Sequence, residues 1–334
     1  MLFLILLAVF VQYCIAGYVL EDDYSKDAFF GNFTPFTEPD PTNGFVVYMN
    51  YENATKQGLM ASVSNYNAAN YMGVDNTSIS DAGRPSMRIS SAKTYNKGLF
   101  IADIAHMPVG CGTWPAFWLV GPSWPTGGEI DIIEGVNLQA ANQMTLHTNA
   151  GCTIGTTGMA SESKVNTTNC DTNASNQKKN AGCSIMSENK QSFGPGFNAI
   201  GGGVYATEWT SQYINIHFFP RSSVPADITS GTPNPSSWGT PMAHFAGNCD
   251  IDQHFTDMNI VFDTTLCGQW AGAEDVWGAS NCASTSATCN AHAQLLPSAF
   301  TEAYWLINGV QVYQEAGSNG KMKREVRRRE FVQW

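Results

Sequence analysis

Short apolar stretches alternate with polar turns along most of the chain. Val, Ile, Phe and Tyr fill these stretches and Gly, Asn, Pro and Ser bound them, a pattern that predicts β-strands joined by turns. Helical periodicity is scarce, and the segment 297–303 is the one stretch that resembles one or two helical turns. The chain is therefore predicted to be all-β. The predicted strands are 44–49, 59–63, 86–90, 98–105, 116–120, 129–133, 143–148, 203–206, 213–219, 259–262 and 304–314, after an opening strand and loop in 18–36.

Two pairs of these strands are expected to be neighbours in a sheet. The first pair is 86–90 with 98–105, across the turn between them, and the second is 129–133 with 143–148. The stretch 150–203 is rich in Gly, Asn, Ser and Thr and holds three cysteines. It is too polar for a core, so we expect disulfide-pinned loops that lie over one face of the fold.

The body of the chain reads as one domain, because no internal repeat or low-complexity linker divides residues 17–316. The segment 317–334 differs in composition. Residues 321–334 hold six basic and two acidic residues, a net charge of +4, whereas the whole chain carries −11 and the remainder therefore −15. We expect a disordered basic tail, with binding to an anionic polymer as the alternative. An acidic body would repel phosphates, which argues against nucleic acid as a partner.

The first sixteen residues are strongly apolar and uncharged. They are fewer than the roughly 20 residues of a membrane span. They end in Cys14-Ile15-Ala16, with small residues at the two positions that a signal peptidase reads. We therefore expect a signal peptide at 1–16, a secreted extracellular protein, and no membrane association after cleavage. Because no Lys or Arg lies near Met1, a retained anchor is the alternative.

The cysteine count agrees with secretion. Without Cys14, an even number remains, which predicts up to four disulfides in an oxidising compartment but leaves their pairing open. No His lies at zinc-ligand spacing beside these cysteines, so no metal or cofactor is predicted, and a structural Ca²⁺ is not indicated. The eight cysteines are Cys111, Cys152, Cys170, Cys183, Cys249, Cys267, Cys282 and Cys289. Five N-glycosylation sequons, which also fit a secreted glycoprotein, begin at Asn32, Asn53, Asn76, Asn166 and Asn173.

The stretch T-G-G-E-I-D-I-I-E-G-V-N at 126–137 places three carboxylates among isoleucines. Glu129 and Asp131 lie two residues apart, so a strand would put both on one face. Glu134 lies an odd number of residues from Glu129, so a regular strand would turn it to the opposite face. A β-bulge at Ile132–Ile133 would add one residue and return Glu134 to the acidic face, with the isoleucines in the core.

Three carboxylates on one face repel each other, so we expect their pKa values to be pushed apart and one group to hold a proton near neutral pH. Glycoside hydrolysis needs such a pair, one carboxylate as nucleophile and one as general acid/base, about 5–5.5 Å apart in retaining enzymes. The alternative is a solvated acidic edge. The tryptophans upstream of the motif and Gly127-Gly128 before it favour a site.

The motif resembles the signature of glycoside hydrolase family 16, in the laminarinase-like form with the extra residue. The segments HMPVGCGTWPAFW, MTLHT, FGPGFNAIGGGVYA, FFPR, WGTP, LCGQWAG and AYWLINGVQVYQ are similar to those of fungal secreted endo-1,3(4)-β-glucanases, in the same order over 18–314. This resemblance implies a concanavalin-like β-jelly-roll sandwich of two antiparallel sheets, with a substrate cleft on the concave face. It also implies Glu129 as nucleophile, Glu134 as acid/base and Asp131 as a helper that hydrogen-bonds the nucleophile.

The resemblance also proposes substrate-binding residues. Trp118 and Trp124 match the tryptophans upstream of the motif, Trp270 matches a segment that borders the cleft, and Trp114 is a further candidate. An aromatic face suits the axial C–H groups of a sugar ring; core packing is the alternative for each tryptophan. His147, in MTLHT, matches a position that faces the cleft, with a structural role as its alternative.

The predicted function is endo-hydrolysis of β-1,3 links in glucans, including mixed 1,3/1,4 and 1,3/1,6 glucans, with retention of configuration by a monomeric enzyme. The alternatives are a hydrolase of galactan or another β-glycan, or a transglycosylase, on the same scaffold, and a glucan-binding lectin without activity. All three acids are present, which argues against the lectin. Asn137 is expected to be a turn residue. The run 117–123 is more apolar than in the fungal enzymes, which concerns subsite detail rather than the reaction.

Overall fold

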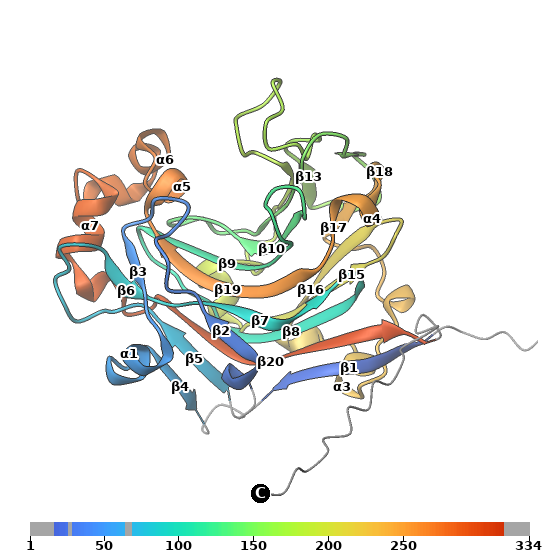
Figure 1. The fold of residues 1–334 in the computed structure, drawn as a ribbon, viewed down its shortest axis with the longest axis horizontal. Helices are drawn as coiled ribbons and strands as arrows, with labels where there is room; N and C mark the ends of the chain where they lie inside the picture. The colour runs from blue at the N-terminus through green and yellow to red at the C-terminus, as the bar shows by residue number, and fades with distance from the viewer. Residues whose placement is uncertain (1–16, 26–28, 64–68, 317–334) are drawn as a thin grey trace, which may run out of the picture.

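The computed structural model describes residues 17–25, 29–63 and 69–316. The predicted signal peptide and basic tail lie outside these residues. Two large sheets pack face to face (Figure 1), each with eight strands. None of the helices that the described residues form is long and apolar enough to cross a membrane. The two antiparallel sheets confirm the prediction of an all-β sandwich.

The first sheet, named here the β8 sheet, has the order β17-β16-β15-β8-β20-β5-β4, and β1 also pairs with β20. Its neighbours are antiparallel throughout. Its strands are β1 (Tyr18–Ser25), β4 (Met60–Val63), β5 (Ala69–Gly73), β8 (Gly98–His106), β15 (Gly203–Trp209), β16 (Ile214–Pro220), β17 (Ala243–Phe245) and β20 (Tyr304–Glu315).

The second sheet, named here the β10 sheet, has the order β13-β14-β11-β10-β9-β19-β7-β2. It curves, with its concave side away from the β8 sheet (Figure 1). Its strands are β2 (Phe33–Pro35), β7 (Arg88–Tyr95), β9 (Thr113–Val120), β10 (Glu129–Glu134), β11 (Gln143–His147), β13 (Ser163–Val165), β14 (Cys183–Ser187) and β19 (Met258–Leu266). Two small two-stranded sheets pair β3 (Val46–Tyr48) with β6 (Arg84–Ser86) and β12 (Thr153–Ile154) with β18 (Gly247–Asn248).

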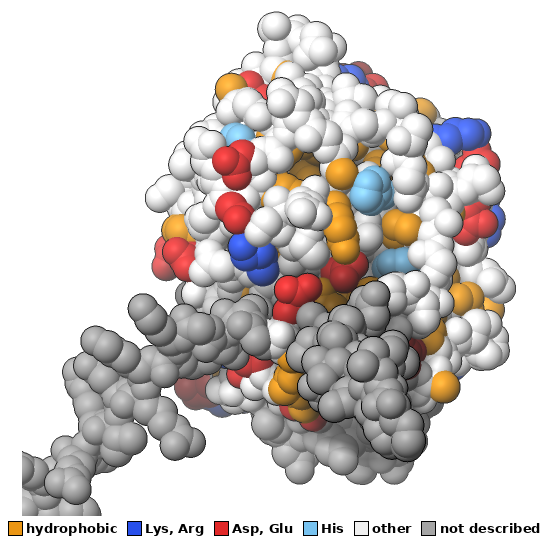
Figure 2. Space-filling model, turned by 90° about the vertical axis from the view of Figure 1, so that its right-hand side faces the viewer, with side chains coloured by type: hydrophobic (Ala, Val, Ile, Leu, Met, Phe, Trp, Pro, Cys, Tyr) orange, Lys and Arg blue, Asp and Glu red, His pale blue; other side chains and the backbone are white. Residues whose placement is uncertain are grey.

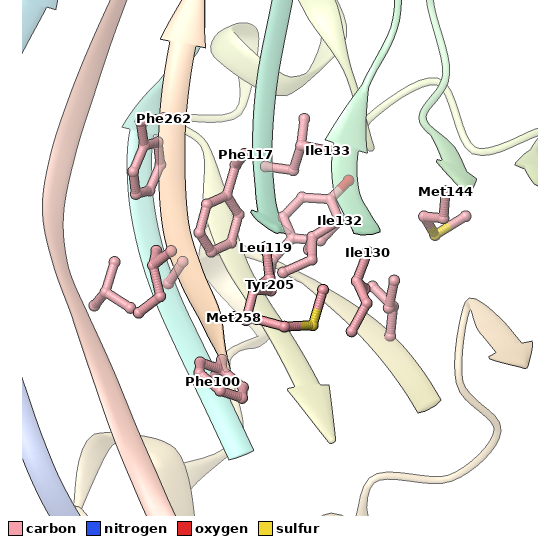
Figure 3. Packing of buried hydrophobic residues seen from close by; sticks show 14 of the residues in the cluster. Phe100, Phe117, Leu119, Ile130, Ile132, Ile133, Met144, Tyr205, Met258 and Phe262 are labelled. Carbon is pink, nitrogen blue, oxygen red and sulfur yellow. The ribbon is translucent and has the colours of Figure 1, made fainter. Parts of the chain in front are cut away.

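The main core lies between the two large sheets. Phe117 and Phe262 of the β10 sheet stack with their ring centroids 4.4 Å apart. Phe100 and Tyr205 of the β8 sheet belong to the same buried cluster, and Figure 3 shows this packing. Burying each such side chain contributes about 1.5–3 kcal/mol. Because side chains alternate along a strand, the residues of the β10 sheet that do not enter this core point to its other face.

Short helices decorate the sandwich. They are α1 (Tyr51–Lys56), α2 (Gly194–Ala199), α3 (Ala226–Thr229), α4 (Ile251–His254), α5 (Gly268–Ala271), α6 (Glu274–Ala279) and α7 (Cys289–Leu295), with 3-10 turns at Phe30–Asn32, Arg221–Ser223, Pro235–Ser237, Asn281–Ser284 and Pro297–Phe300. The last of these confirms the helical turn predicted in 297–303. Helices α5, α6 and α7 surround a small second core that includes Leu266, Trp277 and Phe300.

All eight cysteines predicted to pair form disulfides, which confirms the predicted number of four. Two of the bonds fasten the region of α5–α7 to the β10 sheet, and a third joins the regions of β12 and β18. The pairs are Cys111–Cys282, Cys267–Cys289, Cys152–Cys249 and Cys170–Cys183.

Two predictions about strand neighbours and loops were wrong. Strands β7 and β8 are not paired, because the turn between them carries the chain from one sheet to the other; β7 pairs with β19 and β2, and β8 pairs with β20 and β15. The stretch 150–203 is not only loop, since its strand β14 pairs with β11 and widens the β10 sheet. The predicted pairing of 129–133 with 143–148 is confirmed as β10 with β11.

Candidate active site

Strand β10 contains the predicted β-bulge. Asp131 is paired with Trp118 of β9, and the next paired residue of β10 is Ile133, so Ile132 is the extra residue. The pairing with β11 shifts over the same stretch. A bulge restores the alternation of side chains after it. Glu134 therefore returns to the face that carries Asp131, as the spacing predicted.

The isoleucines of the motif anchor this strand. Ile130, Ile132 and Ile133 are each fully buried in the core between the sheets, and Figure 3 shows them beside the aromatic core residues. Glu129 and Glu134, in contrast, are partly exposed. The acids therefore point away from the core, onto the concave side of the β10 sheet, a surface named here the acid face. A solvated acidic edge does not describe this central strand.

Asn142, the residue before β11, supports the bulge. Its side-chain amide donates a hydrogen bond to the carbonyl oxygen of Ile132 at 2.7 Å and accepts one from the backbone N–H of Glu134 at 3.0 Å. These backbone groups lie where the bulge interrupts the ladder of hydrogen bonds, and buried backbone groups need partners. Asn142 is fully buried. It fixes Glu134 in place, and no sequence signal pointed to it.

His147 lies directly opposite Glu129 on β11. Its Nε2 atom lies 3.7 Å from Oε1 of Glu129 and 3.3 Å from Oδ2 of Asp131. Asp131 is only 2% exposed. The structure thus brings His147 together with the two acids, as predicted. Oδ2 of Asp131 has no hydrogen-bond partner among the described residues, so the role of Asp131 as a helper of Glu129 stays a prediction.

Aromatic side chains lie at both ends of β10. Trp114 donates a hydrogen bond from Nε1 to Oε1 of Glu134 at 2.8 Å, and Trp270 of α5 meets the Trp114 ring edge-to-face at 5.4 Å. Trp124 lies in the connection that enters the strand at Glu129, and it is 44% exposed. In Figure 1, α5–α7 stand at one end of the acid face and the region of β13 and β18 at the other.

Trp118 and Asp263 form a buried pair beside the acids. Trp118 is 9% exposed, and its Nε1 donates to Asp263 at 3.2 Å. Tyr48 donates to the second oxygen of Asp263 at 3.3 Å, and the Arg88 guanidinium lies 4.9 Å above the Trp118 ring. Burial raises the pKa of Asp263 to about 7. Sequence reasoning missed Asp263, although a lone Asp inside an apolar strand was a usable signal.

Burial dominates the ionisation of the three acids. It raises the pKa of Glu129 and of Glu134 to about 8, with the charge of Asp131 as the second cause. The pKa of Asp131 is raised well above its usual range, again mainly by burial. These raised pKa values agree with the expectation that one group holds a proton near neutral pH. The pKa values of the two glutamates are not pushed apart, however, because the same neighbours, Asp131 and His147, act on both.

The XgeA-like, catalytic GH16 domain family matches residues 33–313 of this chain. The chain belongs to glycoside hydrolase family 16.

Among the relatives of this family 16 protein is the endo-1,3(4)-beta-glucanase of Arthroderma benhamiae, 44% identical over 317 residues that cover 93% of this chain and 68% of the relative. The endo-1,3(4)-beta-glucanase xgeA of Emericella nidulans is 40% identical, over 92% of this chain and 49% of the relative. The chain thus spans about two thirds of the length of the first relative and half of the second. The family resemblance predicted from the motifs is confirmed.

Solved structures of family 16 enzymes are similar to this chain. Laminarinase 16A of Phanerochaete chrysosporium, with 6-O-glucosyl-laminaritriose in both donor and acceptor sites, has a TM-score of 0.83 and 42% identity, covering 90% of this chain and all of that one. An elongating family 16 β-1,3-glucosyltransferase has a TM-score of 0.81 and 42% identity, covering 89% of this chain and all of that one. The jelly-roll fold class predicted for this family 16 protein is confirmed.

Asn137 and the motif glycines shape the ends of β10. Asn137 has a φ of 55°, accepts a hydrogen bond from Gly112 N–H and donates one to the Ala271 carbonyl, so it is the turn residue that was predicted. Gly128 has a φ of 80°, and a Cβ atom there would lie 2.3 Å from the carbonyl oxygen of His254. Only glycine fits at this entry to the acid strand.

One group of side chains in the described part of this family 16 protein could hold a metal ion. It comprises Glu129, Asp131 and His147, whose ligand atoms all lie within 4.8 Å of one another. Carboxylate oxygen and imidazole nitrogen are ordinary ligands of Zn²⁺ and Cu²⁺. The absence of a cofactor from the reaction stays a prediction.

Replacing Glu129, the predicted nucleophile, is expected to stabilise the protein at alkaline pH. The raised pKa of Glu129 means that the folded chain holds a proton which the unfolded chain releases between pH 4.5 and about 8. Stability therefore falls as the pH rises through this window. Glu129→Gln removes that loss. At pH 8 we therefore expect its free energy of unfolding to be on the order of 2 kcal/mol larger than that of the wild type.

Calorimetric melting from pH 4 to pH 8 checks this prediction. The gap between Glu129→Gln and wild type should be small at pH 4 and grow with pH. Glu52→Gln, at a largely exposed position in α1, should follow the wild type at every pH. A gap that stays constant from pH 4 to pH 8 would contradict the assignment of a raised pKa to Glu129.

Trp114 is expected to orient Glu134. Its indole N–H occupies Oε1, so a proton on this carboxyl group is left for Oε2. Trp114→Phe keeps an aromatic ring but removes the hydrogen-bond donor. We expect kcat on a β-glucan to fall by about 10-fold, because the Glu134 carboxyl group loses one hydrogen bond. Steady-state kinetics measure it. An unchanged kcat with a raised KM would instead indicate that Trp114 only binds sugar.

Proposed function

We propose that this protein is an endo-acting hydrolase that cuts β-1,3 links in β-glucans, including mixed 1,3/1,4 and 1,3/1,6 glucans, with retention of configuration. The observation that carries the proposal is the bulged strand β10, which sets Glu129 and Glu134 on one face, with Asp131 between them. Two carboxylates flanking the scissile bond are the machinery of a double displacement. The family membership and the β-glucan titles of the relatives support the substrate class.

In the first step, the carboxylate of Glu129 attacks the anomeric carbon while Glu134 gives its proton to the departing glycosidic oxygen. The C–O bond to the leaving sugar breaks and an ester between the glycosyl group and Glu129 forms. The raised pKa of Glu134, due first to burial, keeps its proton available near neutral pH. The hydrogen bond from Trp114 directs that proton toward Oε2.

Glu129 must be ionised for this attack. The electrostatic influence of His147, whose Nε2 lies 3.7 Å from Oε1 of Glu129, lowers the pKa of Glu129 against burial and the charge of Asp131. Burial also raises the pKa of Asp131 well above its usual range, which favours the protonated form of Asp131. The three acids therefore carry fewer negative charges than their number, and the double displacement needs the remaining charge on Glu129.

In the second step, Glu134 acts as a base. It removes a proton from water, the water oxygen attacks the anomeric carbon, and the ester bond to Glu129 breaks. Two inversions at one carbon leave the β configuration unchanged. Trp114 and Trp270 at the Glu134 end and Trp124 at the Glu129 end offer aromatic faces for sugar rings on both sides of the bond.

A neutral polysaccharide suits the surface of this protein. Only 13% of its residues are charged. On the face shown in Figure 2, uncharged side chains predominate among the described residues and the charged ones are scattered. Binding to such a polymer therefore depends on stacking and hydrogen bonds rather than on charge.

Digestion of laminarin and of lichenan tests the proposal. We expect oligosaccharides of several lengths early in the reaction, and proton NMR should detect the β-anomer of the new reducing end before mutarotation. Wild type and Glu134→Gln, purified identically, separate this activity from a contaminant. Release of glucose alone, an initial α-anomer, or no new reducing end from either glucan would refute it.

Transglycosylation is the second candidate function. The observation that favours it is the 42% identity to an elongating β-1,3-glucosyltransferase over 89% of the chain. The chemistry differs in one respect, since a sugar hydroxyl replaces water in the second step. Mass spectrometry of products from a single laminari-oligosaccharide separates the two, because transfer gives products longer than the substrate.

We also propose that the protein is a secreted glycoprotein. Four disulfides among the described residues suit an oxidising compartment. All five sequon asparagines are partly or fully exposed. Sequencing the N-terminus of the secreted protein, and measuring the mass lost on treatment with an endoglycosidase, would test cleavage after Ala16 and glycan attachment together.

A further inference from the structure

We propose that Glu129, Asp131 and His147 form a binding site for one Zn²⁺ or Cu²⁺ ion, which inhibits the enzyme reversibly. The ion is an inhibitor rather than a cofactor, because the proposed reaction needs no metal. Inhibition rests on the proposed function, whereas binding of the ion does not.

The ligand atoms lie close to the spacing that a tetrahedral ion requires, with one pair at that spacing and a second slightly wider. With metal–ligand bonds of about 2.0–2.2 Å, two ligands of a tetrahedral ion lie about 3.3–3.5 Å apart. Nε2 of His147 lies 3.3 Å from Oδ2 of Asp131 and 3.7 Å from Oε1 of Glu129, and the two oxygens lie within 4.8 Å of each other. Asp131 and Glu129 are both acids, and they repel each other when both are ionised. A cation between them would draw them together.

Two atoms at this site have no hydrogen-bond partner among the described residues. One is Oδ2 of Asp131, a residue that is 98% buried, and the other is Nδ1 of His147. Oδ2 lies 3.3 Å from Nε2 of His147, but the two atoms do not form a hydrogen bond. A buried polar atom without a partner requires a physical explanation. An ion coordinated by Oδ2 would supply its partner and offset the repulsion between Asp131 and Glu129.

The ligand set selects the class of metal. One imidazole and two carboxylates suit the late first-row divalent ions, whose affinity for such sites is greatest at Cu²⁺. Ca²⁺ takes six to eight oxygen ligands and Mg²⁺ requires an octahedral shell, and neither favours imidazole nitrogen. The site is therefore expected to bind Cu²⁺ and Zn²⁺ and to ignore Ca²⁺ and Mg²⁺.

The position of the ion explains its effect on the reaction. A bound ion would occupy Oε1 of Glu129, an oxygen of the group proposed to attack the anomeric carbon. It would also hold Asp131 ionised and in place. Sugar binding and metal binding at this point exclude each other, so a saturating oligosaccharide should weaken the ion's apparent affinity.

Isothermal titration of the metal-free full chain with ZnCl₂ tests the proposal without any substrate. We expect one Zn²⁺ per chain and no heat from MgCl₂ or CaCl₂. His147→Gln removes a direct ligand and should weaken the affinity by about 100-fold, because the loss of an outer-shell partner alone costs about 10–100-fold. His244→Gln is the matched control, because His244 lies on β17 of the other sheet and pairs with Asn215.

A second variant and a spectroscopic measurement keep the test independent of folding. Glu129→Gln keeps the shape of the side chain and should also weaken Zn²⁺ binding, with an unchanged circular dichroism spectrum. Electron paramagnetic resonance of the Cu²⁺ complex should report one coordinated imidazole nitrogen, lost in His147→Gln. No Zn²⁺ binding to the wild type, or equal binding by His147→Gln and His244→Gln, would overturn the proposal. Laminarin hydrolysis is measured separately, so a failure of the proposed function remains distinguishable.

Discussion

Glu129→Ala is expected to hydrolyse laminarin at least about 10⁴-fold more slowly than the wild type, because the variant has no group that can form the covalent intermediate. The loss should appear in kcat, with a KM close to that of the wild type. Measuring new reducing ends over long incubations gives the rate. Glu52→Ala, at an exposed site in α1 far along the chain from the motif, is the control and should retain full activity.

Azide sharpens this prediction. The truncation leaves a space where the carboxylate was, and a small anion in that space can attack a β-fluoride donor once. The product should be an α-glycosyl azide, formed by a single inversion at the anomeric carbon. A variant that keeps more than about a tenth of the wild-type rate on laminarin, or one that gives a β-azide, would remove Glu129 from the role of nucleophile.

Glu134→Ala is expected to lose about 10²–10⁴-fold on laminarin, because the departing sugar oxygen then leaves without a proton. An aryl β-glycoside with an acidic phenol needs no proton to leave, so its first step should be nearly as fast as in the wild type. The second step lacks its base. A burst of phenol followed by slow turnover should therefore appear in stopped-flow absorbance.

Azide distinguishes the two glutamates. In Glu134→Ala it should attack the covalent intermediate from the face that water uses and give a β-glycosyl azide, the opposite anomer from that of Glu129→Ala. Equal losses on laminarin and on the aryl glycoside would contradict the assignment of Glu134 as acid/base. An α-azide from Glu134→Ala would mean that the two roles are reversed.

The acid strand could be predicted from sequence because its signal is local. An odd spacing between Glu129 and Glu134, set against buried isoleucines, demands one extra residue, and the pairing places it at Ile132. The register of β10 with β11 then brings His147 to Glu129. The roles of these residues remain predictions, whereas their grouping on one face is a property of the fold.

Contacts made over long distances along the chain escaped prediction. The turn between β7 and β8 has the residues of a hairpin, but hairpin signals do not report whether the chain returns in the same layer or crosses to the other. Trp118 reaches Asp263 across 145 residues, and Tyr48 reaches it across 215. No pattern of alternation in one strand carries information about such partners.

The short helices were missed for a different reason. Helix α7 is capped by Thr288, whose side chain accepts a hydrogen bond from the N–H of Ala291, and α4 is capped in the same way by Asp250. A helix of one or two turns is too short to establish an apolar period, and its stability comes from the cap and from packing against the sandwich. Sequence periodicity therefore has little to detect.

The bulge in β10 makes chain length at this point a matter of chemistry. Many apolar side chains could replace Ile132 in the core with modest cost, yet deleting its codon would rotate Glu134 by half a turn and bury its carboxyl group among the aromatic rings. Apolar substitutions of Ile132 should therefore be tolerated, whereas insertions and deletions within Asp131–Glu134 should abolish activity. The number of residues in this strand, rather than the identity of its middle residues, is what the site depends on.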